Sequence, residues 1–182
     1  MSKSTGLALD IVGASDSTQA NLDAYLPNGT AAQRFSLHRV SEFLDEGAFS
    51  FESGTSSKVL DVAGGSMKDG AVVELYASND TFAQKWYVSK IAGLDNEYEI
   101  KCIGSGKVLS LTDGGELVQL KSSGADSLRW RSTLSGGKIA LQNVAIGQYL
   151  CASGSSVSLG MVDSLELPGV RFEVRNVGEG SF

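Results

Sequence analysis

The 182-residue sequence contains little proline, cysteine or histidine, with two Pro, two Cys and one His. Scarce proline beside 22 Gly and 42% apolar residues is typical of an ordered chain with many tight turns, and argues against disorder. Two cysteines are too few for a disulfide framework. Cys102 and Cys151 both have apolar neighbours, so we expect two small buried side chains or, alternatively, one structural bridge.

Several functional classes also lack their usual signatures. The single histidine, His38, has no partner pattern for a nucleophile or a metal, so we expect no catalytic residue, no metal and no cofactor. The net charge is -6 and the 15 basic residues form no cluster, which argues against a nucleic-acid partner. No apolar run approaches the roughly 20 residues that span a bilayer, so membrane insertion is not expected.

The sequence does contain an internal repeat. Ten positions match without a gap at an offset of 51 residues. A fixed period of this kind is the mark of a repeat architecture. The matching pairs are Leu9/Leu60, Asp10/Asp61, Gly13/Gly64, Ser15/Ser66, Ala20/Ala71, Tyr25/Tyr76, Asn28/Asn79, Thr30/Thr81, Ala32/Ala83 and Gln33/Gln84.

Weaker copies follow the two strong ones. Lys58-Val59-Leu60-Asp61 reappears as Lys107-Val108-Leu109-Ser110 and as Gln148-Tyr149-Leu150-Cys151. An aromatic residue closes each copy, at Phe35, Trp86, Trp130 and Phe172. We therefore expect one structural unit of about forty residues in four copies.

Each complete copy has the pattern of four short strands separated by glycine-rich turns. In the second copy the predicted strands are Ala48–Glu52, Val59–Ala63, Val72–Ala77 and Lys85–Ser89. Three complete copies predict an all-β fold of twelve strands, a closed barrel with a hairpin cap, preceded by a three-strand partial repeat that lacks its opening strand.

The longest and most acidic connector, residues 41–47, places the domain boundary. The prediction is a partial repeat at residues 1–46 and a complete domain at residues 47–182. A second partition stays open at this point: the partial repeat and copies two and three would close a barrel with a strand taken from copy four.

These residues resemble a known family. Val59-Leu60-Asp61-Val62-Ala63-Gly64-Gly65-Ser66, Val73-Glu74-Leu75-Tyr76 and Gln84-Lys85-Trp86 are similar to the ricin B-type (R-type) lectin repeat with its Gln-x-Trp signature, in the form of bacterial cell-surface and secreted proteins. The resemblance implies a β-trefoil that binds galactose-type or related sugars without chemistry. It also implies a secreted or cell-surface module, joined to other domains of a larger protein.

The residue types suit sugar recognition. An ionised Asp accepts hydroxyl hydrogen bonds, an aromatic ring offers an apolar face to the C–H side of a sugar, and an amide both donates and accepts. The resemblance assigns the site in the second copy to Asp61, Tyr76, Asn79 and Gln84, with Glu74. In the first copy it assigns Asp10, Tyr25, Asn28 and Gln33, with Asp23.

The other copies depart from this pattern. At the Asp, Tyr and Gln positions the third copy has Ser110, Lys121 and Leu128, and the fourth has Cys151, Gly160 and Val170. We expect no sugar site there. In the first two copies, Ala32 and Ala83 stand where many family members have an Asn, which predicts weak affinity.

Structural interpretations compete with these assignments. Gln33 and Gln84 could bond to backbone inside the repeat while the aromatic residues after them fill the core. The two Asp residues could brace the glycine loop, and the two Tyr residues could be ordinary strand aromatics. Asn28-Gly29-Thr30 and Asn79-Asp80-Thr81 match a glycosylation acceptor, but turn chemistry explains them equally and is favoured.

The expected function is therefore carbohydrate binding, and the alternative is a structural or protein-interaction module that has lost it. A glycosidase pair, Asp10/Asp61 or Asp61/Glu74, is a weaker hypothesis because equivalent residues of repeats lie on separate units instead of converging on one bond.

Overall fold

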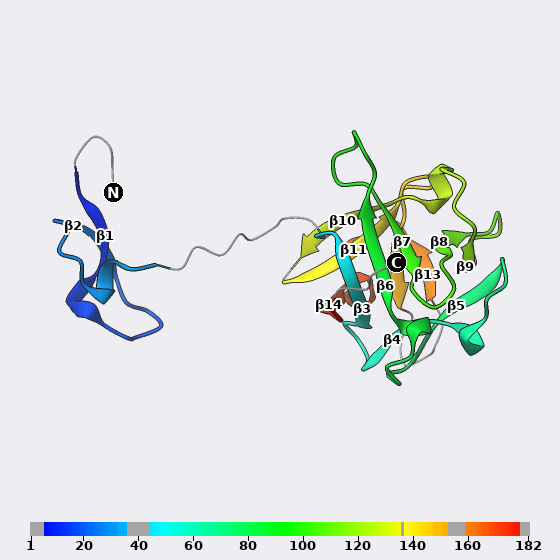
Figure 1. Cartoon of the computed structure of the whole chain (residues 1–182), viewed down its shortest axis with the longest axis horizontal. Coiled ribbons are helices and arrows are strands. Elements are labelled where there is room, and N and C mark those ends of the chain that lie inside the picture. Colours follow the sequence, from blue (N-terminus) through cyan, green and yellow to red (C-terminus); the bar gives the residue numbers. More distant parts are fainter. Residues whose placement is uncertain (1–5, 36–43, 136, 153–158, 179–182) are drawn as a thin grey trace. The chain divides into compact units, whose positions relative to one another are not determined.

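The computed structural model describes residues 6–35, 44–135, 137–152 and 159–178, which belong to two compact units (Figure 1). The units comprise Met1–Val40 and Ser41–Phe182. Leu44 is buried in the core of the second unit, where its backbone N–H donates to Ser132 Oγ at 2.9 Å. Glu46 Oε1 accepts from the Lys90 backbone N–H at 2.9 Å. Both residues thus belong to the second unit, and the predicted domain boundary after residue 46 stays a prediction.

The first unit, called here the partial repeat, contains two antiparallel strands, β1 (Ala8–Ile11) and β2 (Leu22–Tyr25). Single 3₁₀ turns follow them, η1 (Val12–Ala14) and η2 (Ala31–Gln33). The offset of 51 places the third expected strand at residues 35–39. Residues 36–39, including His38, lie outside the described residues.

The second unit contains three repeats of four strands. The second repeat consists of β3 (Gly47–Ser53), β4 (Lys58–Val62), β5 (Ala71–Ala77) and β6 (Trp86–Lys90). The third consists of β7 (Tyr98–Cys102), β8 (Val108–Leu111), β9 (Leu117–Leu120) and β10 (Trp130–Ser135). The fourth consists of β11 (Lys138–Asn143), β12 (Tyr149–Ala152), β13 (Leu159–Val162) and β14 (Phe172–Asn176). The four strands predicted for the second repeat agree with these bounds to within one residue at each end.

The described residues of the second unit also contain four 3₁₀ turns: η3 (Ala63–Gly65), η4 (Phe82–Gln84), η5 (Asp126–Leu128) and η6 (Pro168–Val170). One such turn stands directly before the last strand of every repeat. The closing aromatic of each repeat therefore lies at the same position, at the start of the last strand.

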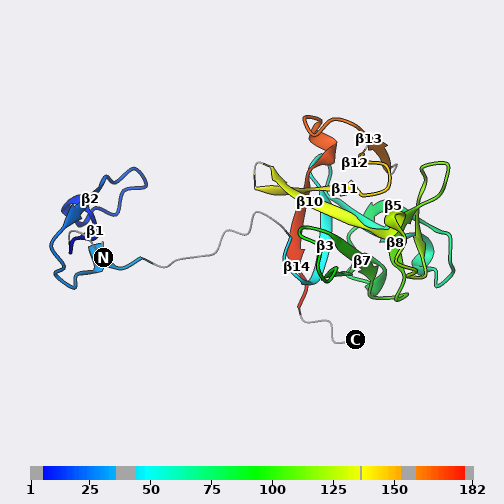
Figure 2. The ribbon, with the colours of Figure 1, turned by 90° about the horizontal axis from the view of Figure 1, so that it is seen from above.

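The first and last strands of the three repeats form a closed ring. β3 pairs with β6, β6 with β7, β7 with β10, β10 with β11, β11 with β14, and β14 returns to β3. Figure 2 shows β14 and β3 side by side at this seam. The inner hairpins β4–β5, β8–β9 and β12–β13 are the cap. This is the predicted β-trefoil, and its ring is built from three complete repeats with no strand of the partial repeat.

The closing aromatics fill the core of the barrel. Trp86, Trp130 and Phe172 are fully buried, as predicted. Phe35 is 41% exposed, so the prediction that it is a core residue is wrong. The reason is that the described part of the partial repeat has no surrounding barrel strands to cover the ring.

The two tryptophans also hold the cap hairpins. The indole N–H of Trp86 donates to the Leu60 carbonyl at 3.1 Å, and that of Trp130 donates to the Leu109 carbonyl at 3.0 Å. Because Leu60 directly precedes Asp61, the core tryptophan fixes the strand that carries the candidate carboxylate.

The two cysteines are free and buried. They behave as the small apolar side chains that the sequence predicts, and the alternative of a bridge is excluded.

Candidate functional site

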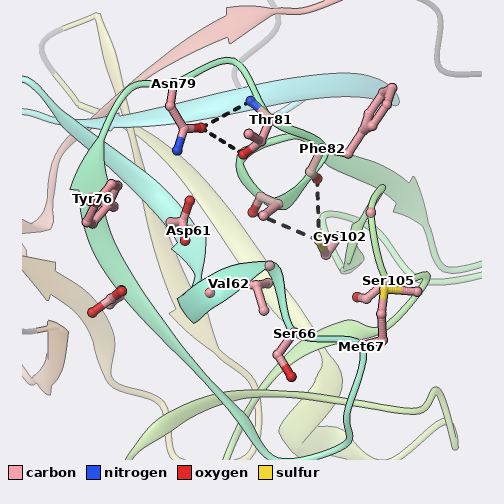
Figure 3. Close-up of a pocket in the computed structure, with 15 residues that line it drawn as sticks. Asp61, Val62, Ser66, Met67, Tyr76, Asn79, Thr81, Phe82, Cys102 and Ser105 are labelled. Carbon is pink, nitrogen blue, oxygen red and sulfur yellow. Dashed lines mark hydrogen bonds between the residues drawn. The ribbon is translucent and has the colours of Figure 1, made fainter.

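A cavity of about 610 Å³ opens beside the second repeat (Figure 3). One side consists of the hairpin β4–β5, which contributes Asp61, Glu74 and Tyr76. The turn after β5 adds Asn79. Four of the five residues predicted for this copy therefore line one cavity.

Asp61 and Glu74 lie directly opposite each other on the two strands of this hairpin. Directly opposite residues of antiparallel strands share a face, so the two carboxyl groups are neighbours on the same side of the cavity. Asp61 is only 5% exposed. Burial raises the pKa of Asp61 above its usual value, and a hydrogen bond from the Gln84 side chain partly opposes that rise.

The described structure gives no hydrogen bond between Asp61 and the glycine loop at residues 63–66, which argues against the brace interpretation. Its carboxylate is instead an acceptor turned to the cavity. Such a group gains most from a ligand that brings hydroxyl donors, because a buried carboxylate has lost its water.

Tyr76 is 50% exposed and stands at the end of β5, opposite Val59. Its ring lies beside Asp61 at one end of the cavity (Figure 3). The ring is not packed beneath the cap, so its face is available to the C–H side of a sugar.

The side chain of Asn79 is held in place by hydrogen bonds from Thr81. Its Oδ1 accepts from the Thr81 backbone N–H at 3.1 Å and from Thr81 Oγ1 at 2.7 Å. The turn interpretation of Asn79-Asp80-Thr81 is thereby confirmed. With the oxygen engaged, the amide nitrogen points toward the cavity (Figure 3) and can donate to a ligand.

Gln84 stands behind the cavity and does not line it. Its Oε1 accepts from the Asn79 backbone N–H at 2.8 Å, and its Nε2 donates to the Ala77 carbonyl at 2.9 Å. The side chain is 2% exposed. The structural interpretation of Gln84 is confirmed: it fixes the turn that carries Asn79, and any direct contact with sugar stays a prediction.

The partial repeat reproduces this turn. Asn28 N–H donates to Gln33 Oε1 at 2.9 Å, and Gln33 Nε2 donates to the Leu26 carbonyl at 2.9 Å. Asn28 Oδ1 accepts from the backbone N–H and the hydroxyl of Thr30 at 3.0 and 2.8 Å. Turn chemistry is therefore the same in both copies.

The acidic pair is reproduced as well. Asp10 lies opposite Asp23 in the β1–β2 register, and Tyr25 is 55% exposed. Asp10 Oδ1 is buried and has no hydrogen-bond partner among the described residues. All five predicted residues thus keep the arrangement of the second repeat. The described residues of the partial repeat do not include a following repeat that could line the other side of a cavity.

The register of the third repeat corrects one alignment. Val108 pairs with Leu120 as Val59 pairs with Tyr76, so Leu120 occupies the Tyr position and the assignment of Lys121 is wrong. Ser110 occupies the Asp position and is fully buried. Leu128, at the Gln position, is also buried. The third repeat therefore has no carboxylate at the Asp position and no aromatic ring at the Tyr position.

The fourth repeat needs the same correction. Tyr149 pairs with Val162, which puts Val162 at the Tyr position, whereas Gly160 pairs with Cys151 and occupies the position of Glu74. The assignment of Gly160 is wrong because the loop after β12 was aligned without its register. Val170, at the Gln position, is fully buried.

The sequence reasoning missed the far side of the cavity. Phe82 and Met67 line it from the second repeat, and Cys102, Gly104 and Ser105 line it from the third. Matching the copies could not identify these residues, because the partial repeat has Ala31 and Asp16 at the positions of Phe82 and Met67. A wall from the next repeat is visible only in three dimensions.

Two features are absent from the described ranges. These ranges contain no cluster of three or more His, Cys, Asp or Glu side chains that could hold a metal ion. They also contain no helix that is long and apolar enough to cross a membrane.

Known structures share this fold. A designed threefold-symmetric protein, ThreeFoil, is 25% identical with a TM-score of 0.66, and the match covers 72% of this chain and all of ThreeFoil. An exo-β-1,3-galactanase from Clostridium thermocellum is 20% identical with a TM-score of 0.65, over 80% of this chain and 32% of the galactanase. The chain therefore spans about a third of that enzyme.

A lectin from Polyporus squamosus, solved with Neu5Acα2-6Galβ1-4GlcNAc, is 13% identical with a TM-score of 0.65, over 74% of this chain and half of the lectin. No curated protein sequence matches the chain. The family model of the ricin-type β-trefoil lectin domain-like proteins matches residues 1–76 and 82–162. With a family match over most of its length and a closed trefoil of three repeats, the chain belongs to the ricin-type β-trefoil lectin domain-like family.

Proposed function

We propose that the cavity of the second repeat binds a carbohydrate, of galactose type or related to it, and does so without catalysis. The observation that carries the proposal is the half-exposed Tyr76 ring beside the buried carboxylate of Asp61 in one cavity. An apolar ring face, a charged acceptor and the Asn79 amide donor are the three kinds of group that distinguish a sugar from water.

The roles follow from the geometry. Asp61 accepts hydrogen bonds from two sugar hydroxyls, Tyr76 packs against the C–H face, and Asn79 donates from its amide nitrogen. Gln84 keeps the Asn79 turn in place. Glu74, opposite Asp61, offers a further acceptor on the same side of the cavity. The partial repeat would use Asp10, Tyr25 and Asn28 in the same roles, with Gln33 and Asp23 in support.

Binding affinity tests this proposal. Isothermal titration with galactose should give a dissociation constant between micromolar and millimolar, because a single sugar has few contact atoms with which to offset the freedom it loses on binding. Asp61→Asn and Tyr76→Ala should each weaken binding about tenfold or more, since a hydrogen bond to a charged group contributes about 1.5–3 kcal/mol. Ser110→Ala, at the Asp position of the third repeat, is the matched control and should leave affinity unchanged.

The competing function is a structural or protein-interaction module. If no sugar of a broad glycan array binds, and Asp61→Asn behaves as the parent in that array, the lectin proposal fails in favour of this alternative.

The absence of catalysis is part of the proposal. A glycosidase places its two carboxyl groups on either side of the scissile bond. Asp61 and Glu74 instead are cross-strand neighbours of one hairpin, on one side of the cavity. Incubation with candidate glycans should therefore release no reducing sugar, and release that disappears in Glu74→Gln would overturn this point.

The setting is proposed on the same basis. Glycans are presented mainly on cell surfaces and in cell walls, so we propose that the module acts as a secreted or cell-surface part of a larger protein. The galactanase, three times the length of the matched region, supports the idea that this fold occurs inside longer chains. We also propose that residues 47–182 form the trefoil domain and that residues 1–46 form a partial repeat. Surface labelling of the intact producing cells, read with an antibody to this chain, tests the location.

A further inference from the structure

The cavity is longer than the cluster of predicted sugar-binding residues. Asp61, Tyr76 and Asn79 lie on one side of it, Met67 and Ser105 lie on the other, and Phe82 stands at the upper rim with its ring directed outward (Figure 3). The volume of about 610 Å³ falls in the range of sites for drug-sized ligands, which are larger than a single hexose.

The far side and the rim differ from the first side in chemistry. Phe82 is 64% exposed and Met67 is 62% exposed, although both are large apolar side chains. An aromatic ring and a thioether at the mouth of a cavity provide apolar surface that a flat, partly apolar ligand can cover. The first side orients a sugar by hydrogen bonds, whereas the far side and the rim offer packing.

Phe82 is also well anchored by its backbone. Its carbonyl accepts from the Gly104 backbone N–H at 3.1 Å and from the Cys102 thiol at 3.6 Å. A Cβ on Gly104 would stand 3.1 Å from the Phe82 carbonyl carbon, so the third repeat approaches η4 closely only because residue 104 is glycine. Lys85 Nζ lies 5.4 Å from the centre of the Phe82 ring, a cation–π distance that favours one ring position.

We propose that Phe82 and Met67 form a second subsite, in which the next sugar of an oligosaccharide stacks, so that the ligand of this cavity is a disaccharide or longer glycan and not a single sugar. This inference rests on the proposed carbohydrate-binding function and adds the ligand class. The partial repeat has Ala31 and Asp16 at these positions, so its residues supply only the first subsite.

A paired titration tests the inference. The purified chain is titrated with galactose and lactose, glucose and cellobiose, and N-acetylglucosamine and chitobiose. For the sugar that binds, the disaccharide should bind about tenfold more tightly than its monosaccharide. Phe82→Ala should remove that difference while leaving the monosaccharide affinity unchanged. Because the ring is exposed, Phe82→Ala should keep the fold, and Phe82→Trp should restore the preference.

A second readout uses the methyl groups of methionine. The ¹³C signal of the Met67 methyl should shift with the disaccharide and not with the monosaccharide, with the Met161 methyl as an internal control. Equal affinities for the two members of every binding pair, or an equal loss of both in Phe82→Ala, would overturn the second subsite while leaving the proposed function standing. Failure of every sugar to bind would overturn both.

Discussion

The partial repeat and the second repeat carry the same turn chemistry in very different surroundings. Gln33 and Gln84 make the same two backbone bonds, with lengths of 2.8–2.9 Å in both copies. The apolar positions differ: Leu60 is fully buried and Val73 is 3% exposed, whereas their equivalents Leu9 and Leu22 are 51% and 54% exposed. The hydrogen-bonded turn is thus a local property of the sequence, and burial is a property of the closed barrel.

The two copies share the geometry of the hairpin residues but differ in the residues that surround them. Both copies place an acidic pair and a half-exposed Tyr on one hairpin. Only the second repeat has the third repeat as a neighbour whose residues line the cavity. A pocket in this fold therefore needs a hairpin and also the repeat that follows it.

The largest expected difference between the copies concerns the closing aromatic. Trp86→Ala should lower the free energy of unfolding of the trefoil by about 3–5 kcal/mol, because it empties core volume and leaves the Leu60 carbonyl unpaired. Phe35→Ala should leave the trefoil unaffected. Urea unfolding measures both effects, because both tryptophans lie in the second unit and report on the trefoil. The fluorescence of the remaining Trp130 follows unfolding of Trp86→Ala, and the fluorescence of both tryptophans follows unfolding of Phe35→Ala.

If Trp86→Ala fails to fold, Trp86→Phe gives a milder version, in which the indole hydrogen bond is lost together with only part of the core volume. A loss of trefoil stability in Phe35→Ala equal to that in Trp86→Ala would contradict the assignment of burial to the second unit alone.

The next effect concerns the glutamine pair. Gln84→Ala should cost the trefoil about 2–3 kcal/mol, because two nearly buried hydrogen bonds are lost. Gln33→Ala removes the same bonds from an exposed turn and should not move the Trp-reported transition. Hydrogen exchange at the Asn79 amide should accelerate in Gln84→Ala; unchanged protection there would show that Gln84 does not hold the turn.

A smaller effect is expected in the glycine loop. Gly65 has φ of +60° and its counterpart Ala14 has φ of +49°. Both lie in the left-handed region, which is energetically unfavourable for any residue that has a Cβ. Gly65→Ala should cost about 1 kcal/mol, which corresponds to roughly 4 °C in the melting temperature. Gly104→Ala is the comparison: its Cβ would contact the Phe82 backbone, so this substitution should lower the free energy of unfolding more than Gly65→Ala does. A smaller loss in Gly104→Ala would contradict the close packing of η4 on the third repeat.

The smallest stability effect is expected from the charge of Asp61, and its size depends on pH. The folded-state pKa is raised by burial, so the stability associated with this group is present below its ordinary value near pH 4 and is lost as pH rises through the folded-state pKa. Asp61→Asn should therefore raise the melting temperature at pH 7, and the gain should fade below about pH 4. Thermal unfolding at several pH values measures it; a constant gain would rule out charge burial as the cause.

Much of the fold is readable from the sequence, for a physical reason. The spacing of Trp86, Trp130 and Phe172 reflects one core position per repeat, and glycine-rich turns separate strands that the barrel needs. Predictions failed where burial depends on the closed barrel or where residue equivalence depends on strand register. Phe35 is exposed because no described barrel strands cover its ring. The strand pairing places Leu120 and Val162 at the Tyr position, where the sequence alone predicted Lys121 and Gly160.

The site divides in the same way. Asp61, Tyr76 and Asn79 could be predicted because they recur as Asp10, Tyr25 and Asn28. Phe82 and Ser105 could not, because one is absent from the other copy and the other comes from the next repeat.

Amide correlation spectra of the ¹⁵N-labelled chain, recorded during titration with galactose and lactose, would locate the sugar site residue by residue. We predict chemical-shift changes that concentrate at the residues around Asp61, Tyr76 and Asn79. Signals of the hairpins β8–β9 and β12–β13 should stay in place. Shifts confined to those two hairpins, or no shift with either sugar at concentrations of tens of millimolar, would contradict sugar binding at the second repeat.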